Sequence, residues 1–270
     1  MSLFPSLDGF EPTRKTLHLY AQAVGVVPRT HAAAHDKWWH ISLRVTPTGL
    51  KTAVFDLPSS ESAWLEMDLT RHLVRLQTSY GGTQTFDMQA GLTGTEFGEQ
   101  ILTAVAGLGL DGDYAREKFA DDDPRHYDPQ QAANFFAALT SAHRIFSEHR
   151  AGLVGKLGPV QLWPHGFDLA FEWFGTRIET YEEQGELQEM PGQLNLGFYP
   201  GGDPYFYSNP WPFAETLLDH ALPDGARWHT DDWQGSMLPY AELVGDDNAE
   251  ARLRAFARRV YELARPTLMD

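Results

Sequence analysis

The sequence contains no cysteine among its 270 residues. Disulfide bridges, thiolate nucleophiles and metal centres held by cysteine are therefore excluded. Positive charge is also scarce, since 21 Lys and Arg residues accompany 37 Asp and Glu residues, and the formal net charge is −16. Nucleic-acid affinity comes largely from Lys and Arg side chains that displace counterions from phosphate, so we expect no nucleic-acid partner.

Long apolar runs are missing too. No stretch approaches the roughly 18 uninterrupted apolar residues of a membrane-spanning helix. The first ten residues, MSLFPSLDGF, lack the basic start and the apolar core of a signal peptide. We therefore expect no membrane partner and a cytoplasmic location. With 42% hydrophobic residues, the chain has enough apolar side chains for a large core.

The same order of predicted elements occurs twice. Residues 83–108 are expected to form a short strand, a capped turn and an amphipathic helix, and residues 235–263 repeat this order with small gaps. A helix-like stretch and two aromatic-rich strands precede each copy. The pattern predicts an α+β fold with two similar lobes from an internal duplication, each an antiparallel sheet with packed helices, related by a pseudo-twofold axis.

One stretch has the composition of a linker. Residues 113–128 are polar, acidic and proline-containing, as is typical of a connection over the surface. We expect a first lobe at 1–112, the connector at 113–128 and a second lobe at 129–270, either as two domains or as one compact domain.

Periodicity and capping residues predict individual elements. Residues 16–24 favour a helix, and the strict alternation in KWWHISLRV, residues 37–45, favours a strand. One face of that strand is expected to carry Trp39, Ile41, Leu43 and Val45.

Capping signals predict two helix starts. Thr93 and Glu96 have the spacing of a capping box. Asp128 followed by Pro129 has the order of an N-cap and a first helical residue.

Several stretches resemble one bacterial family over nearly the whole chain. They are TLHLYAQAVG, KWWHISLRVTPTGL, FSEHRAGLVGKLGPVQLWPHGFDLAFEWFGTR, GFYPGG and the MLPY before the last helix. The chain is similar to members of DUF5996, a family known only as a domain of unknown function. The family pattern falls on His18, Gln22, Trp38, Trp39, His40, Gly155, Lys156, Pro159, Val160, Phe167, Asp168, Gly197, Pro200, Gly201 and Gly202. The chain departs from it at residues 163–166. The resemblance implies no activity, cofactor or catalytic residue.

Two groups of polar residues are candidates for a site. His18 and Gln22 lie one helical turn apart and share a face, where they either tie down a loop or bind a ligand. Lys156, between glycines, is either a surface lysine or a point-charge anchor for phosphate or carboxylate. The stretch around it lacks the spacing of a phosphate-binding loop.

Aromatic residues supply further candidates. Trp38 and His40 share the polar face of the predicted strand, which is either exposed to water or turned towards the second lobe. In the second arrangement they would meet Gln161, Trp163 and Asp168 across a cleft, and aromatic walls with a few polar groups are typical of small-molecule sites. The aromatic stretch 192–212, which includes Tyr199, either covers a pocket or closes the end of a sheet.

No metal site or cofactor is expected. His31, His35 and His40 match no zinc-binding spacing, and the run Asp121–Asp123 is typical of a solvated charged segment.

Two hypotheses of function remain. The first is the binding or conversion of a small polar or anionic metabolite in an aromatic-lined cleft between the lobes. The alternative is a protein-interaction or scaffold module that uses the same aromatic surface. The candidate ligand-binding residues are His18, Gln22, Trp38, His40, Lys156, Gln161, Trp163, Asp168 and Tyr199.

Overall fold

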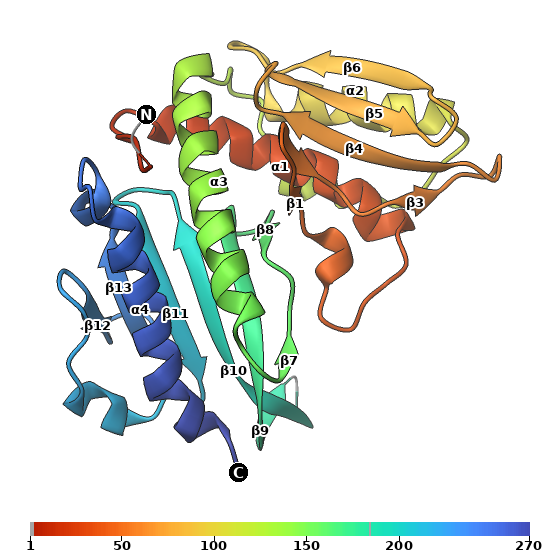
Figure 1. The fold of residues 1–270 in the computed structure, drawn as a ribbon. Helices are drawn as coiled ribbons and strands as arrows, with labels where there is room; N and C mark the ends of the chain where they lie inside the picture. Colours follow the sequence, from red (N-terminus) through yellow and green to blue (C-terminus); the bar gives the residue numbers. More distant parts are fainter. Residues whose placement is uncertain (1–2, 184) are drawn as a thin grey trace. The chain divides into compact units, whose positions relative to one another are not determined.

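The fold combines α-helices with antiparallel sheets, which confirms the α+β class (Figure 1). The computed structural model describes residues 3–183 and 185–270. The helices of the described residues are α1 Glu11–His31, α2 Gly94–Gly107, α3 Pro129–Ala151 and α4 Ala249–Ala264, with 3-10 turns η1 Trp39–Ile41, η2 Arg116–Lys118, η3 Glu215–Asp219, η4 Tyr240–Leu243 and η5 Arg265–Leu268. The strands are β1 Arg44–Val45, β2 Gly49–Lys51, β3 Phe55–Asp56, β4 Ser62–Asp68, β5 Leu73–Thr78, β6 Thr83–Asp87, β7 Lys156–Leu157, β8 Gln161–Trp163, β9 Asp168–Glu183, β10 Glu186–Tyr199, β11 Tyr205–Trp211, β12 Arg227–His229 and β13 Gly235–Pro239.

Contacts divide the chain into two compact units. The first unit contains Leu7–Phe136 and Gln161–Asp168. The second unit contains the described residues of Met1–Ser6, Ala137–Val160 and Leu169–Asp270. Helix α3 therefore begins in the first unit and ends in the second. The predicted connector, residues 113–128, belongs to the first unit by its contacts.

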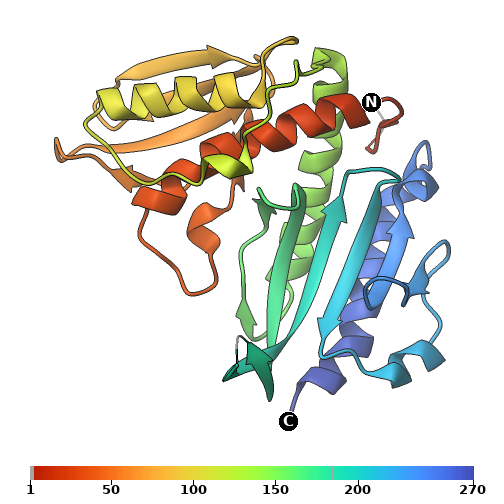
Figure 2. The ribbon, with the colours of Figure 1, turned by 180° about the vertical axis from the view of Figure 1, so that it is seen from behind.

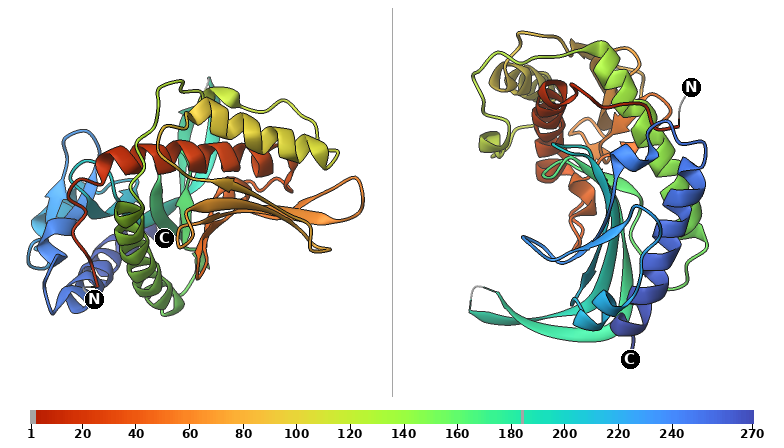
Figure 3. Two further views of the ribbon diagram at one scale, coloured as in Figure 1. Left: turned by 90° about the horizontal axis from the view of Figure 1, so that it is seen from above. Right: turned by 90° about the vertical axis from the view of Figure 1, so that its left-hand side faces the viewer.

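The first unit is an antiparallel meander with two helices on one face. Its strand order is β1-β2-β4-β5-β6, and β3 pairs with β4. Helices α1 and α2 cover one face of this sheet, as the view from above shows (Figure 3). Leu65 and Met67, which alternate along β4, are fully buried. Alternation turns Trp64, Glu66 and Asp68 to the other face.

Both predicted helix starts are confirmed. Thr93 accepts a hydrogen bond from the Glu96 N–H, and the Glu96 carboxylate accepts one from the Thr93 N–H, each at 3.0 Å. The Asp128 carboxylate accepts hydrogen bonds from the N–H groups of Gln130 and Gln131 at 2.8 and 3.2 Å. Each start therefore satisfies N–H groups that have no partner within the helix.

The predicted strand over residues 37–45 is wrong for most of its length. Trp38 has a left-handed backbone with φ of 58° and begins the 3-10 turn η1, so strand geometry begins only at Arg44. The expected division of faces is wrong as well, because His40, placed on the polar face, is buried. Hydrogen bonds between Leu43 and Leu162, each 2.8 Å, hold the chain after the turn.

Helix α1 is much longer than residues 16–24. It continues through Pro28 to His31, although proline cannot donate the hydrogen bond that the Val24 carbonyl would receive. Val26, Val27 and Pro28 are all buried. Their apolar contacts offset the missing hydrogen bond and keep the last turn helical.

The second unit is also an antiparallel sheet with helices on one face. Its strand order is β12-β13-β11-β10-β9-β7. The front and back views show α3 and α4 on the same face of this sheet (Figures 1 and 2). The Phe146 ring of α3 lies 6.4 Å from the Phe171 ring and 6.2 Å from the Phe206 ring. Leu169, Phe171 and Trp173 of β9 are buried.

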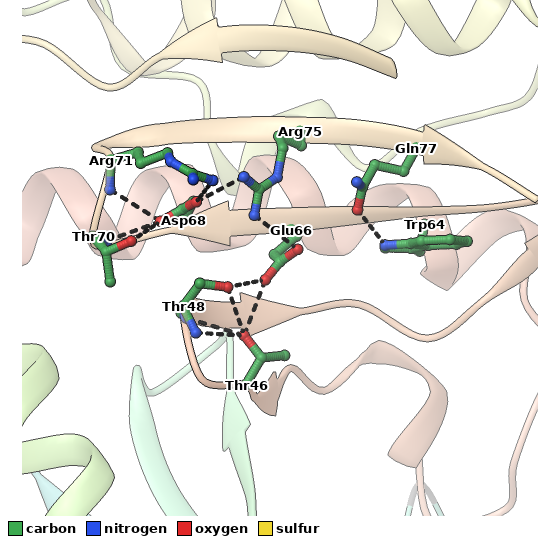
Figure 4. A network of polar contacts seen from close by, with 10 residues as sticks. Thr46, Thr48, Trp64, Glu66, Asp68, Thr70, Arg71, Arg75 and Gln77 are labelled. Carbon is green, nitrogen blue, oxygen red and sulfur yellow. Dashed lines mark hydrogen bonds and ion pairs between the residues drawn. The ribbon is translucent and has the colours of Figure 1, made fainter. Parts of the chain in front are cut away.

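A buried network of charges occupies the outer face of the first sheet (Figure 4). Glu66 accepts hydrogen bonds from Thr46 at 3.0 Å, Thr48 at 2.5 Å and Arg75 at 3.2 Å. Arg75 also forms an ion pair of 2.8 Å with Asp68, which is fully buried. Because both carboxylates have partners within the sheet, the network is expected to stabilise the fold rather than to bind a ligand.

The pKa of Asp68 reflects two opposing effects. Burial alone raises this pKa, but hydrogen bonds from Thr70 and from the N–H groups of Arg71 and Thr70, together with the charge of Arg75, hold it below the ordinary value of 3.8. The folded pKa is therefore lower than the unfolded one. The carboxylate contributes stability at pH values above the unfolded pKa and loses it as the pH falls through the folded pKa.

Replacing Asp68 tests this network. We expect Asp68→Asn to lower the free energy of unfolding by about 1.5–3 kcal/mol at neutral pH, because Arg75 and Thr70 lose a charged acceptor. The loss should begin to shrink as the pH falls below about 4, the ordinary pKa of an Asp in the unfolded chain. It should disappear only below the lower folded pKa, where the natural carboxyl group is protonated as well. Urea denaturation at several pH values measures both effects. Asp87→Asn, at an exposed position in β6, is the control. An equal loss in both variants, or a loss independent of pH, would contradict the assignment.

Candidate functional site

A pocket of about 140 Å³ lies entirely within the first unit. Helix α1, the turns η1 and η2, and the turn that follows β8 form its walls. The residues that line it are Gln22, Gly25, Val26, Arg29, Ile41, Lys118, Pro164 and His165. We call this site the α1 pocket.

A close approach between α1 and the turn after β8 shapes one wall. A Cβ atom at Gly25 would lie 3.3 Å from Cγ of Pro164, so glycine lets the turn pack directly on the helix. The His18 ring nitrogen Nε2 lies 3.2 Å from the carbonyl oxygen of His165. Phe167 ends the turn and is fully buried, with its ring stacked on that of His18.

Two cations at this pocket have no acidic partner among residues 3–183 and 185–270. Arg29 and Lys118 are both exposed, and the Arg29 guanidinium lies 4.9 Å from the ring centre of Trp38. Other arginines of the same unit are paired: ion pairs of 2.7, 2.8 and 3.0 Å hold Arg14, Arg75 and Arg125. In a chain with a net charge of −16, two unpaired cations on one pocket give it a locally positive potential.

Burial favours the neutral form of two histidines near the pocket, His18 and His40. Burial is the main cause that lowers the pKa of His18 below 6.5, and the charge of Arg14 adds to it. Burial likewise lowers the pKa of His40, with the charges of Arg29 and His35 as further causes. At neutral pH both rings are hydrogen-bonding groups and not cations.

The structure brings several predicted residues to this pocket. Gln22 lines it, and its Nε2 atom lies 3.2 Å from Nε2 of His18, so the predicted helical pair is present. Trp38 contacts Arg29 and stacks on His40 at a ring distance of 5.5 Å. The Trp163 ring lies 5.6 Å from the His165 ring, which lines the pocket.

Three other predicted residues of the first unit make contacts within that unit. Gln161 is fully buried, with its Oε1 atom 2.5 Å from the Ser42 hydroxyl. Nδ1 of the buried His40 accepts a hydrogen bond of 3.1 Å from the His35 N–H. Asp168 is half-buried, and its carboxylate lies next to Gly166, where a Cβ atom would come within 2.5 Å of it.

Two predicted residues belong to the second unit. Lys156 is exposed in β7, with its ammonium group 5.7 Å from the ring centre of Phe174. Tyr199 ends β10, and its ring lies 5.4 Å from that of Tyr205. A site that these residues share with His18 and Gln22 stays a prediction.

Sequence reasoning missed both cations of the pocket. Arg29 follows Pro28, where the predicted helix had already ended. A helix continued through the proline would have placed Gln22, Val26 and Arg29 on one face, at spacings of four and three residues. Lys118 lies in the acidic stretch 113–128, and no local pattern connects it with α1.

Two other kinds of feature are absent from the described residues. No helix within 3–183 or 185–270 is long and apolar enough to cross a membrane. In the same ranges, no group of three or more His, Asp or Glu side chains is arranged to hold a metal ion.

Comparison with known proteins identifies a family and nothing further. No curated protein and no solved structure matches the chain. The model of a family of unknown function, DUF5996, matches residues 4–268, which is nearly the full length. The resemblance of the sequence motifs is thereby confirmed, and the chain belongs to the family DUF5996.

Proposed function

We propose that the first unit binds a small organic anion in the α1 pocket. The observation that carries this proposal is the presence of Arg29 and Lys118 on one pocket without an acidic partner in the described parts of the chain. An anionic group would lie between these cations, and Gln22 would donate a hydrogen bond to it. The sequence suggested a small polar or anionic metabolite in a cleft between the lobes. The proposal specifies an anionic ligand, with the α1 pocket as its site.

The remaining walls suit the body of such a ligand. Gly25, Val26, Ile41 and Pro164 present apolar atoms. Pockets for small molecules commonly combine apolar walls with a few polar groups that fix orientation. No carboxylate is among the lining residues, so the pocket itself offers no negative charge to oppose an anionic ligand.

One observation favours the alternative of a protein-interaction module. The Trp38 side chain is 51% exposed, and exposed tryptophans are enriched in the energetic centres of interfaces. However, Trp38 already contacts Arg29 and His40 within the unit. We therefore favour the role of Trp38 as a support that positions Arg29 at the pocket.

The internal duplication and the cytoplasmic location also stay proposals. In support of the duplication, each unit follows the order helix, antiparallel sheet, helix. The last strands differ, because β6 forms the edge of its sheet whereas β13 lies between β11 and β12. The absence of a membrane-spanning helix in the described residues supports no particular compartment.

Binding of benzoate, with benzamide as its neutral isostere, tests the proposed function. We expect benzoate to bind and benzamide to bind at least about tenfold more weakly, since a hydrogen bond to a charged group contributes about 1.5–3 kcal/mol. The double variant Arg29→Gln, Lys118→Gln should lose benzoate binding to a similar extent. Isothermal titration calorimetry measures both effects.

Lys15→Gln is the matched control, because Lys15 is an exposed lysine on α1 outside the pocket. It should leave the dissociation constant of benzoate unchanged. Equal affinity for the two probes, or unchanged benzoate binding in the double variant, would contradict an anion site at Arg29 and Lys118.

A second experiment separates residues that hold the fold from residues that are free to contact a ligand. His40→Ala should lower the free energy of unfolding by about 0.5–1.5 kcal/mol, because the His35 N–H loses its acceptor. Lys156→Ala, at an exposed position, should change it by less than about 0.5 kcal/mol. Thermal and urea denaturation of both variants give these values. The reverse order of the two losses would show that the structural role of His40 is wrong.

A further inference from the structure

A second cavity, of about 400 Å³, lies within the second unit between α3 and α4. We call it the α3–α4 cavity. Its lining residues from α3 and the turn that follows are Glu148, His149, Gly152 and Leu153, and those from α4 are Arg254, Arg258, Tyr261 and Glu262. The view in Figure 3 shows the two helices side by side, and the rings of His149 and Tyr261 lie 6.2 Å apart.

A network of ion pairs fixes the two helices beside this cavity. Arg144 pairs with Glu250 at 2.6 Å, Glu250 pairs with Arg254 at 2.7 Å, and Arg254 also pairs with Glu148. The hydrogen bonds from Arg144 and Arg254 lower the pKa of Glu250 to about 2. Arg254 and Glu148 therefore already have partners of opposite charge on the two helices.

Two oppositely charged side chains on the same wall form no ion pair. Arg258 and Glu262 line the cavity, are exposed, and form no ion pair with each other or with another described residue. They are four residues apart on α4, so their Cβ atoms are about 5–6 Å apart on one helix face. The cavity thus offers one positive and one negative group at a short separation.

This separation suits an α-amino acid. Its ammonium and carboxylate groups are attached to the same carbon atom, so both can reach adjacent charges on one helix face. A ligand with only one of the two charges would leave either Arg258 or Glu262 without a partner. Such a ligand would reduce the access of water to the second charged side chain without giving it a partner of opposite charge, which disfavours its binding.

The other walls suit an apolar side chain. Leu153 and Tyr261 supply apolar surface, and Gly152 has no side chain to fill the space. Burial and the charges of Arg258 and Arg254 lower the pKa of His149 to about 4. The imidazole is neutral at pH 7 and adds no third charge.

We propose that the α3–α4 cavity binds a zwitterionic amino acid with an apolar side chain, whose carboxylate lies at Arg258 and whose ammonium group lies at Glu262. This site lies in the other unit from the α1 pocket and does not depend on the function proposed there.

L-Phenylalanine and two truncated analogues test the proposal by calorimetry on the full chain. The analogue 3-phenylpropionate lacks the ammonium group, and phenethylamine lacks the carboxylate. All titrations use the Arg29→Gln, Lys118→Gln background, so that an anion bound at the α1 pocket does not contribute heat. We expect L-phenylalanine to bind saturably and each analogue to bind at least tenfold more weakly.

Charge-neutral variants then locate the site. Arg258→Gln and Glu262→Gln should each weaken L-phenylalanine binding at least tenfold, with unchanged melting temperatures because both side chains are exposed and unpaired. Arg265→Gln, an exposed arginine in η5, should leave binding unchanged. The ring resonances of His149 should shift on addition of L-phenylalanine in the parent background and shift less in Glu262→Gln.

Three results would overturn the proposal: no saturable binding of L-phenylalanine, equal binding of either analogue, or unchanged binding in both charge-neutral variants. Because the background already lacks Arg29 and Lys118, each of these results bears on the α3–α4 cavity alone. Failure of benzoate to bind the unmodified protein would bear on the α1 pocket alone.

Discussion

The ring of Phe167 lies between the imidazole of His18 and the ring of Phe135, at centroid distances of 5.6 and 5.3 Å. Phe167 is fully buried and has a left-handed backbone, with φ of 57°, so its apolar contacts hold a conformation that a bulky side chain otherwise disfavours. The turn that carries Pro164 and His165 ends at this residue. The wall of the α1 pocket therefore depends on the stacking of one ring, and the neutral His18 serves the fold and the pocket at once.

Features that depend on neighbours in the chain were predictable. The capping box at Thr93 and Glu96 and the N-cap at Asp128 require only short spacings, and both are present. The strand over residues 37–45 failed because alternation does not reveal the left-handed backbone of Trp38. The length of α1 was underestimated because Pro28 disfavours a helix locally, whereas burial of the surrounding residues is a tertiary effect.

The candidate site was predictable to a similar extent. The helical spacing of His18 and Gln22 placed both on one face, and the structure finds them in contact. Arg29 and Lys118 are 89 positions apart in the sequence (118 − 29 = 89). They share a pocket only because η2 packs beside α1. No local pattern contains such a pairing. Gln161 and Trp163 illustrate a related problem, since they follow the start of the expected second lobe at residue 129 but belong to the first unit by their contacts.

Each unit consists of segments that are not continuous in the sequence, and this limits how the protein can be divided. Residues 161–168 complete the first unit, although they follow 137–160, which belong to the second. Tyr240 of the second unit donates a hydrogen bond of 2.7 Å to the carbonyl oxygen of Pro5, near the start of the chain. No single break in the polypeptide therefore releases either unit whole. Recombination between relatives at one crossover would replace parts of both units together, so the chain is expected to be inherited and exchanged as one module.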